Sequence, residues 1–262
     1  MNLMAAADLL DEHPEVDTLF FESGGDNLTL TFSPALVDVF VFVLDTAEGD
    51  KMPRKRGPGI TDSHILVINK PTLLLSVPGR GPAHADSLAS RVQMEFADAR
   101  IVHRLDMATS GLLIMARGLE MERRLSIAFQ QRQVEKRYIA VVAGRPSPDE
   151  GEIALPLITD WPNRPRQKVD FEAGKPSLTH YTLLSHDAAQ DSSRVDLRPH
   201  TGRSHQLRVH MMAIDHPILG DELYGDPDSR HAAERLLLHA TELTLPHPLT
   251  GAPLHFVSTP PF

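Results

Sequence analysis

Hydrophobic and polar positions along the chain indicate many short strands and few helices. Continuous or alternating apolar runs are typical of strands; they cover residues 28–32, 35–44, 65–68, 112–116, 139–143, 153–158, 179–184, 194–197, 240–245 and 254–257. Pro156 lies inside one of these runs, which predicts an edge strand there. Regular βαβ repeats are missing from this order, which agrees with an α+β class.

Helical spacing predicts four helices, over residues 88–96, 119–133, 206–214 and 230–238. Ser87 is the expected N-cap of the first, and Ser204 that of the third. In the second helix an apolar stripe that includes Met121 and Leu125 opposes a charged face, as in a surface helix that packs on a core.

Charge is distributed unevenly along the 262 residues, whose formal net charge is −9. Residues 1–50 contain eleven Asp and Glu but no Lys or Arg, so residues 51–262 carry 26 basic and 35 − 11 = 24 acidic side chains. A nearly neutral body can still present a basic face, so charge neither supports nor excludes RNA as a partner. We expect residues 1–60 to be an acidic extension with a basic Pro/Gly linker, and residues 61–262 to form the main domain.

Composition also narrows the chemistry and the compartment. The chain has no cysteine, which excludes disulfides and thiolate catalysis. Residues 1–17 lack the basic start of a signal peptide. The most apolar run, 35–44, is short and contains Asp38, so no membrane span is expected. A cytoplasmic protein is therefore the default expectation.

The most informative stretch is His103-Arg104-Leu105-Asp106, followed by a Thr109-Ser110-Gly111 turn and a strand. An aspartate just before a strand, with an arginine two residues earlier, fits an active-site carboxylate; it fits a structural ion pair equally well. Arg208 lies near the start of the helix at 206–214 and would need a carboxylate partner if buried, for which Asp106 is a candidate.

Other side chains suit nucleic-acid contacts. The loop at 160–168 holds the only tryptophan, Trp161, among basic residues, which fits single-stranded RNA as well as an ordinary Pro-rich surface loop. Tyr138 begins a strand, where it can pack at the rim or stack on a base. His200, His205 and His210 are five residues apart, and this spacing puts helical side chains on different faces, so no metal site is predicted.

Taken together, these stretches resemble the RluA-type pseudouridine synthases. The resemblance spans about residues 65–262 and rests on three motifs in the family's order: His103-Arg104-Leu105-Asp106 with Thr109-Ser110-Gly111, Lys136-Arg137-Tyr138, and Thr201-Gly202-Arg203-Ser204-His205-Gln206-Leu207-Arg208-Val209-His210. Residues 160–169 and the loop at 76–80 resemble the dual-specificity RluA subgroup, which modifies an anticodon-loop uridine in tRNA and a uridine in large-subunit ribosomal RNA. Residues 1–60 do not resemble the S4 RNA-binding domain of other members.

The resemblance implies an α+β pseudouridine synthase fold, with a mixed, largely antiparallel sheet, peripheral helices and a central active-site cleft. It implies an isomerase that converts uridine to pseudouridine in RNA, at uridine 32 of the tRNA anticodon loop and uridine 746 of 23S ribosomal RNA. Because the reaction has no redox or phosphoryl step, no cofactor or metal is expected. We expect a monomer whose partner is tRNA or large-subunit ribosomal RNA, and a protein lacking residues 1–60 that stays folded and active.

Roles for individual residues follow from the same resemblance. Asp106 would act at the sugar, as a nucleophile at C1′ or as a base at C2′, and Arg208 would keep it ionised. Tyr138 would stack on the flipped uracil and take part in proton transfer, and Arg104 would occupy the vacated space in the RNA. Further RNA contacts are expected from His103, Arg80, Trp161, Arg164, Arg166, Lys168 and Arg203, with His103 serving structure rather than acting as a base.

Two other function classes compete with this interpretation. A non-catalytic RNA-binding or ribosome-assembly protein could use the same fold, but it would have no use for a set made of Asp106, Tyr138 and Arg208. A metal-dependent hydrolase would use the histidines, and their spacing argues against it.

Overall fold

A computed structural model describes residues 41–45, 64–248 and 251–262 of the chain. Its main feature is a ten-stranded sheet in the order β1-β2-β4-β11-β5-β10-β9-β6, with β12 paired to β11 and β3 to β4. The strands are β1 Val41–Asp45, β2 Ile65–Lys70, β3 Ala99–Ile101, β4 Ser110–Arg117, β5 Glu135–Ala143, β6 Glu150–Ala154, β9 Leu178–Asp187, β10 Ser192–Pro199, β11 Leu238–Pro246 and β12 Pro253–Val257.

Within this sheet only the β1–β2 and β4–β11 pairs are parallel, so the mixed, largely antiparallel sheet that was predicted is confirmed for the described residues. A separate two-stranded ribbon consists of β7 Leu157–Thr159 and β8 Gln167–Val169. The helices are α3 Leu88–Glu95, α4 Gly118–Gln130, α5 Gln206–Ala213 and α6 Pro227–His231, with short 3-10 turns at Pro82–His84 and Trp161–Asn163.

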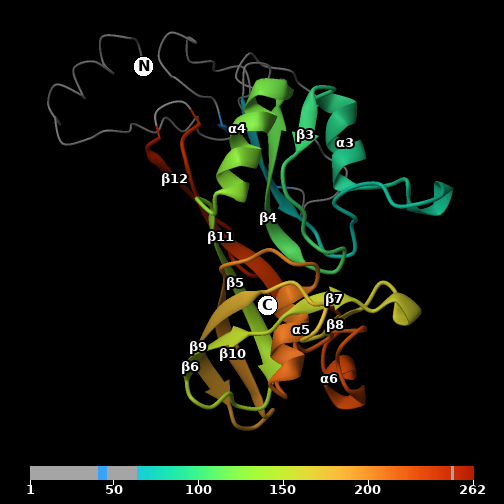
Figure 1. Ribbon diagram of the computed structural model, residues 1–262, viewed down its shortest axis with the longest axis vertical. Coiled ribbons are helices and arrows are strands. Elements are labelled where there is room, and N and C mark those ends of the chain that lie inside the picture. Colours follow the sequence, from blue (N-terminus) through green and yellow to red (C-terminus); the bar gives the residue numbers. More distant parts are fainter. Residues whose placement is uncertain (1–40, 46–63, 249–250) are drawn as a thin grey trace, which may run out of the picture.

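The long sheet joins two halves of the molecule (Figure 1). In the first half α3 and α4 flank β2, β3 and β4; in the second, α5, α6 and the β7–β8 ribbon lie beside β5, β9 and β10. The halves meet where β4 runs parallel to β11, with Gly111 opposite Ala240. A side chain at Gly111 would collide with the Ala240 backbone, so this junction requires glycine.

The core explains why the apolar runs at 65–68 and 112–116 are continuous rather than alternating. Leu66, Ile68, Leu113 and Met115 pack toward α3 in one cluster. The intervening residues of β2 and β4 pack toward α4 in another. Strands covered on both faces are apolar throughout. In the second half, α5 is held on β5 and β10 by a third cluster that includes Leu207 and Met211, as the helical spacing predicted.

Three element predictions are wrong. The run at 153–158 is split between β6 and β7, because Pro156 has no N–H for the ladder and the chain changes sheets there. The helix predicted at 230–238 is instead α6, which ends at His231 and is capped by the Asp226 carboxylate; Leu236, just before β11, and Leu238, its first residue, are buried in the core. Ser204 is not an N-cap; His205 holds that position, and the Gln206 side chain closes the turn.

The remaining boundaries are close to expectation. Ser87 caps α3 through a capping box with Ser90, as predicted, and α4 ends at Gln130 rather than at 133. The predicted strand at 28–32, most of the run at 35–44 and the basic linker lie outside the described residues. The end of that run, β1, pairs with β2 of the main sheet, so removing residues 1–60 also removes an edge strand. The domain boundary at residue 60 stays a prediction.

Within the described ranges, every helix falls short of the length and apolar character that a membrane span requires.

Candidate active site

A cleft of about 1040 Å³ lies where the two halves meet. Its walls come mainly from four stretches of chain, at 75–77, 102–109, 129–138 and 198–208, with His180 and Leu238 in addition. Of the predicted site residues, six line this cleft: Asp106, Tyr138, Arg208, Arg104, His103 and Arg203. The other five lie outside it: Arg80, Trp161, Arg164, Arg166 and Lys168.

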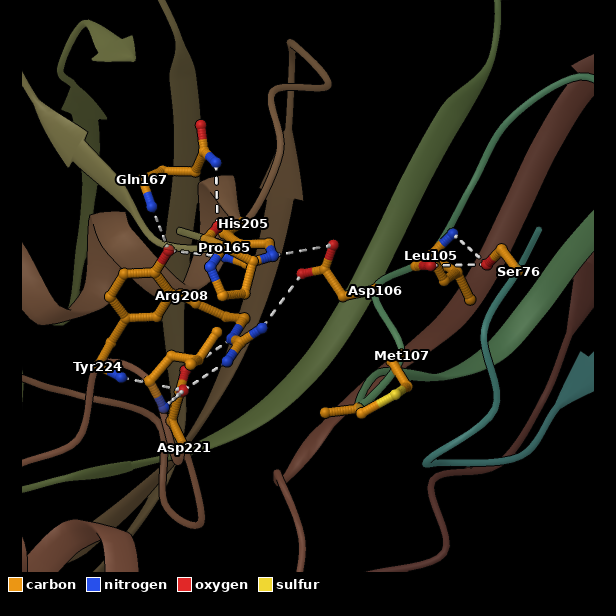
Figure 2. Close-up of polar contacts among 12 residues, drawn as sticks. Ser76, Leu105, Asp106, Met107, Pro165, Gln167, His205, Arg208, Asp221 and Tyr224 are labelled. Carbon is orange, nitrogen blue, oxygen red and sulfur yellow. Dashed lines mark hydrogen bonds and ion pairs between the residues drawn. The ribbon is translucent and has the colours of Figure 1, made fainter. Parts of the chain in front are cut away.

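Asp106 lies in a loop whose backbone is bonded to the segment that follows β2. The Ser76 hydroxyl donates to the Leu105 carbonyl at 2.6 Å and accepts the Leu105 N–H at 3.1 Å (Figure 2). Thr72 donates to the Ala108 carbonyl at 2.7 Å. The residues on both sides of Asp106 are therefore held by the neutral side chains of Ser76 and Thr72. A buried lysine, Lys70, adds a further bond to this loop.

Lys70 is fully buried, and its ammonium donates to the carbonyls of Pro71, Leu74 and Met107 at 2.9, 2.8 and 3.1 Å. Burial lowers the pKa of Lys70 to about 7, while the negative charge of Asp106 acts in the opposite direction. Three carbonyl acceptors match the three donors of an ammonium group. Lys70 therefore ties the end of β2 to the loop that carries Asp106.

Arg208 approaches Asp106 from α5 in the other half, with Nη1 3.5 Å from Oδ2. The predicted pairing of these two residues is thus present, but Asp106 is not the closer partner. Arg208 donates to both carboxylate oxygens of Asp221, at 2.7 and 2.6 Å. Burial opposes its charge, yet the hydrogen bond to Asp221, with the charges of Asp221 and Asp106, raises the pKa of Arg208 above its usual value.

Asp221 is itself fully enclosed. Its Oδ1 also accepts the backbone N–H groups of Leu223 and Tyr224, at 2.9 and 3.1 Å. A buried carboxylate needs such a set of donors. Asp221 therefore holds Arg208 in place, and Arg208 presents a fixed positive charge to Asp106.

Tyr138 lies on the cleft side of β5, two residues after Lys136, which lines the same cleft. Arg137, between them, points to the other face and pairs with Asp196 and Glu242. Burial, and then the negative charge of Asp106, raise the pKa of Tyr138, so its phenol stays protonated at neutral pH. No described residue bonds its hydroxyl, which leaves the ring and the O–H available to a bound base.

Two histidines of the predicted motifs have different surroundings. His103 accepts the Ile114 N–H at 2.9 Å and stacks on Phe129, with ring centroids 4.6 Å apart. Burial and then the charge of Lys136 lower the pKa of His103 to about 3, so it is a neutral structural acceptor. Its predicted contact with RNA stays a prediction. His205, which precedes α5, places Nε2 3.9 Å from Oδ1 of Asp106.

The remaining predicted RNA contacts lie in several different loops. Arg104 is exposed and has no protein partner among the described residues. Arg164 stacks over exposed Trp161, and the Lys168 ammonium pairs with Asp170 at 3.2 Å. This loop and the one carrying Arg80 project from the same side of the molecule, one from each half (Figure 1). Arg166 lies over the Tyr224 ring, at 5.5 Å.

Groups of three or more potential metal ligands are not found within the described part of the chain. Among the histidines of the third motif, His210 has both ring nitrogens next to hydroxyl groups, those of Ser177 and Thr179, and burial lowers its pKa to about 4.

Sequence reasoning missed Lys70, Ser76, Asp221 and Tyr224. Lys70 had only a weak signal, as a lysine two residues after the aliphatic run at 65–68 and just before Pro71. Asp221 had a weaker one, as the first of two acids in an otherwise apolar stretch, thirteen positions after an arginine that needs a partner. Nothing in the sequence singles out Ser76.

Comparison with known proteins shows which family the chain belongs to. The family described as RNA pseudouridylate synthase matches residues 64–213. Dual-specificity RNA pseudouridine synthase RluA of Escherichia coli K12 is 54% identical over 74% of this chain and 89% of the relative. The protein of the same name from Pasteurella multocida is 49% identical over 77% and 91%.

Among solved structures, human RNA Pseudouridylate Synthase Domain Containing 1 is 30% identical, with a TM-score of 0.65 over 76% of this chain and 81% of that one. Human RNA Pseudouridylate Synthase Domain Containing 4 is 27% identical, with a TM-score of 0.60 over 76% and 86%. The chain therefore belongs to the RNA pseudouridylate synthase family and, within it, to the RluA-type enzymes.

Proposed function

We propose that this RNA pseudouridine synthase isomerises uridine 32 in tRNA anticodon loops and uridine 746 in 23S ribosomal RNA. The observation that supports an enzyme most directly is the cleft itself, where Asp106 lies 3.5 Å from Arg208 and shares the walls with Tyr138. The dual-specificity names of relatives that are 49–54% identical support the two targets. A non-catalytic RNA-binding protein would gain nothing from the buried Arg208–Asp221 pair beside Asp106.

The reaction is an isomerisation, so its atoms balance without a co-reactant. The bond from N1 of uracil to C1′ breaks, the base turns, C5 bonds to C1′, and the proton on C5 is removed while N1 gains one. The Asp106 carboxylate acts at the sugar, as a nucleophile at C1′ or as a base at C2′. The charge of Arg208 stabilises the carboxylate whenever it is released during the cycle.

Tyr138 and Arg104 act on the base and on the RNA. The target uridine has to leave its stack, which costs a few kcal/mol. The Tyr138 ring offers a stacking surface worth about 1–3 kcal/mol. Its hydroxyl, protonated and without a protein partner among the described residues, can act as a relay that gives its own hydrogen to another acceptor while it takes the proton from C5. Arg104, exposed at the rim, occupies the space that the base leaves.

The test uses the full-length protein with two RNAs, a tRNA anticodon stem-loop and a 23S fragment, each matched by a copy with cytidine at the target position. Chemical mapping is expected to find pseudouridine at position 32 and at position 746, and at neither in the cytidine copies. Asp106→Asn should form no product while its Kd for RNA changes less than about threefold. Product at other uridines only would overturn the targets, and turnover by Asp106→Asn would overturn its role.

Tyr138→Phe belongs in the same experiment because it separates two roles of one ring. It keeps the stacking surface and removes only the hydroxyl. A proton role predicts a rate loss of about 10²-fold or more with unchanged RNA affinity. An unchanged rate would restrict Tyr138 to stacking. A monomer acting in the cytoplasm also stays a prediction, and light scattering that found a stable dimer would contradict the first part.

A further inference from the structure

A line of close contacts connects the base of the Trp161 loop to Asp106. The Gln167 N–H, at the start of β8, donates to the Tyr224 hydroxyl at 2.7 Å. That hydroxyl lies 2.7 Å from Nδ1 of His205. The other nitrogen of the same imidazole, Nε2, faces Oδ1 of Asp106 at 3.9 Å. Figure 2 shows the four residues in this order, with Arg208 beside them.

The direction of these hydrogen bonds decides where the imidazole proton lies. A phenol has one hydrogen to donate, and the Tyr224 oxygen already accepts the Gln167 N–H. Its other partner among the described residues is Nδ1 of His205, so the hydroxyl hydrogen finds an acceptor only if it is donated to that nitrogen. Nδ1 is then an unprotonated acceptor, and the imidazole carries its hydrogen on Nε2, toward Asp106.

Electrostatics supports the same protonation states. Burial raises the pKa of Tyr224 to about 12, so it keeps the hydrogen that it donates. Burial lowers the pKa of His205, against the opposing effect of Asp106, so it is neutral at pH 7. Asp106, Arg208, Asp221 and Tyr224 are the charged and titratable groups that influence it.

The backbone at His205 is also held in a costly conformation. Its φ of 54° and ψ of 19° are left-handed, a region that non-glycine residues rarely occupy. The Gln206 side chain closes the turn by accepting the Arg203 N–H at 3.0 Å, and the His205 ring packs edge-on against Tyr224, with centroids 5.6 Å apart. Strain of this kind persists where the surroundings impose it, and it is concentrated at functional sites.

We propose that His205 is a positioning residue for Asp106, and that Tyr224 sets its tautomer. The start of α5 then supplies one donor for each carboxylate oxygen: Arg208 for Oδ2 and His205 Nε2–H for Oδ1. The 3.9 Å separation shortens to a hydrogen bond when RNA fills the cleft, as catalytic hydrogen bonds often do. This inference rests on the proposed role of Asp106.

Two substitutions of His205 separate a positioning role from a purely structural role, because the two roles predict opposite orders of activity for the variants. His205→Gln keeps an amide N–H near the place of Nε2, whereas His205→Asn reaches only the place of Nδ1. A left-handed backbone tolerates asparagine better than glutamine. If His205 only shapes the turn, the Asn variant should be the more active. If it positions Asp106, single-turnover rates should fall about 10–100-fold in His205→Asn and less than about fivefold in His205→Gln, with RNA affinity unchanged.

Tyr224→Phe tests the second half of the proposal without touching the active carboxylate. Loss of the hydroxyl lets the imidazole hydrogen move to Nδ1, which turns a lone pair toward Asp106. The rate should fall about tenfold in the wild-type background but hardly at all in His205→Gln, which does not depend on the tautomer. Tyr181→Phe is the matched control, because it removes a hydroxyl that donates to the Pro148 carbonyl at 3.2 Å, away from the cleft.

Nitrogen NMR of histidine-labelled protein gives an independent measurement, with the His205 signals assigned by their loss in His205→Gln. Hydrogen on Nε2 in the wild type, and a larger share of the Nδ1 tautomer in Tyr224→Phe, is the expected result. Hydrogen on Nδ1 in the wild type, or an Asn variant as active as the Gln variant, would overturn the proposal. Asp106→Asn is assayed alongside: if it retains turnover, the proposed role of Asp106 fails, whatever the His205 variants do.

Discussion

The two sides of the cleft hold Asp106 in different ways. On the first side, Ser76 and Lys70 bind the backbone around it with bonds of 2.6–3.1 Å. On the second side, Arg208 and His205 approach its carboxylate but remain 3.5 and 3.9 Å away. One side therefore sets where the aspartate is, and the other sets its charge and orientation.

This difference explains why Asp221 is needed. A carboxylate in a bidentate pair with arginine has most of its lone pairs occupied and is a poor nucleophile or base. Here the short bonds of Arg208 go to Asp221, at 2.7 and 2.6 Å. Asp106 receives the nearby positive charge without being saturated by it. Arg208 therefore has a full partner without Asp106, and the Asp106 carboxylate stays free to approach the ribose.

The largest effect is expected from Asp221→Asn, which removes the charge that holds Arg208. A buried guanidinium without its partner costs about 3–5 kcal/mol of folding free energy. Arg208 is also freed to form a close pair with Asp106, so single-turnover activity should fall as well. Denaturant unfolding and a single-turnover assay measure the two losses.

Glu222→Gln is the control for that experiment, since it makes the same charge change at the next, exposed residue. It should alter the unfolding free energy by less than about 0.5 kcal/mol. If Asp221→Asn were as stable and as active as this control, Asp221 would not be the residue that holds Arg208 in place.

A smaller effect is expected on the first side, from Ser76→Ala. The variant loses both bonds to Leu105 and leaves a buried N–H without a partner, which costs about 1–3 kcal/mol. Because no charge is involved, the loss should be the same at low and high salt. Ser185→Ala, at an exposed position of β9, is the control. A loss that depends on salt would mean that Ser76 acts through the charged groups of the second side, Arg208 and Asp221.

How much of this could be predicted from sequence differs between the two sides. Asp106 and Arg208 lie in contiguous motifs, and the need of a buried arginine for a carboxylate made Asp106 a candidate partner, although Asp221 is the residue that meets this need. The role of Ser76 on the first side was not foreseen, because Ser76 and Leu105 are 29 residues apart and a serine in a loop has no distinctive pattern. The same holds for Asp221, which only the folded chain brings to Arg208.

The fold shows a related division. Runs that are apolar on both faces, such as 65–68 and 112–116, are covered on both faces here, so the local apolar pattern was sufficient to predict these strands. It failed at 230–238, where local helical spacing competed with burial of Leu236 and Leu238 in the core of the second half. Tertiary packing decided that segment, and packing partners distant in sequence cannot be read from a local pattern.

The smallest effect on the folded protein is expected from Arg104→Ala, since Arg104 is exposed and belongs to neither network. The unfolding free energy should change by less than about 0.5 kcal/mol, as for the control Arg123→Ala on the exposed face of α4. The RNA assay should respond differently. If Arg104 fills the space left by the flipped uridine, its loss should slow modification of a folded stem-loop several-fold more than that of an unstructured oligonucleotide, whose base is already unstacked. An equal loss on both RNAs would mean that Arg104 contacts phosphate instead, and the salt dependence of binding should then weaken by about one charge.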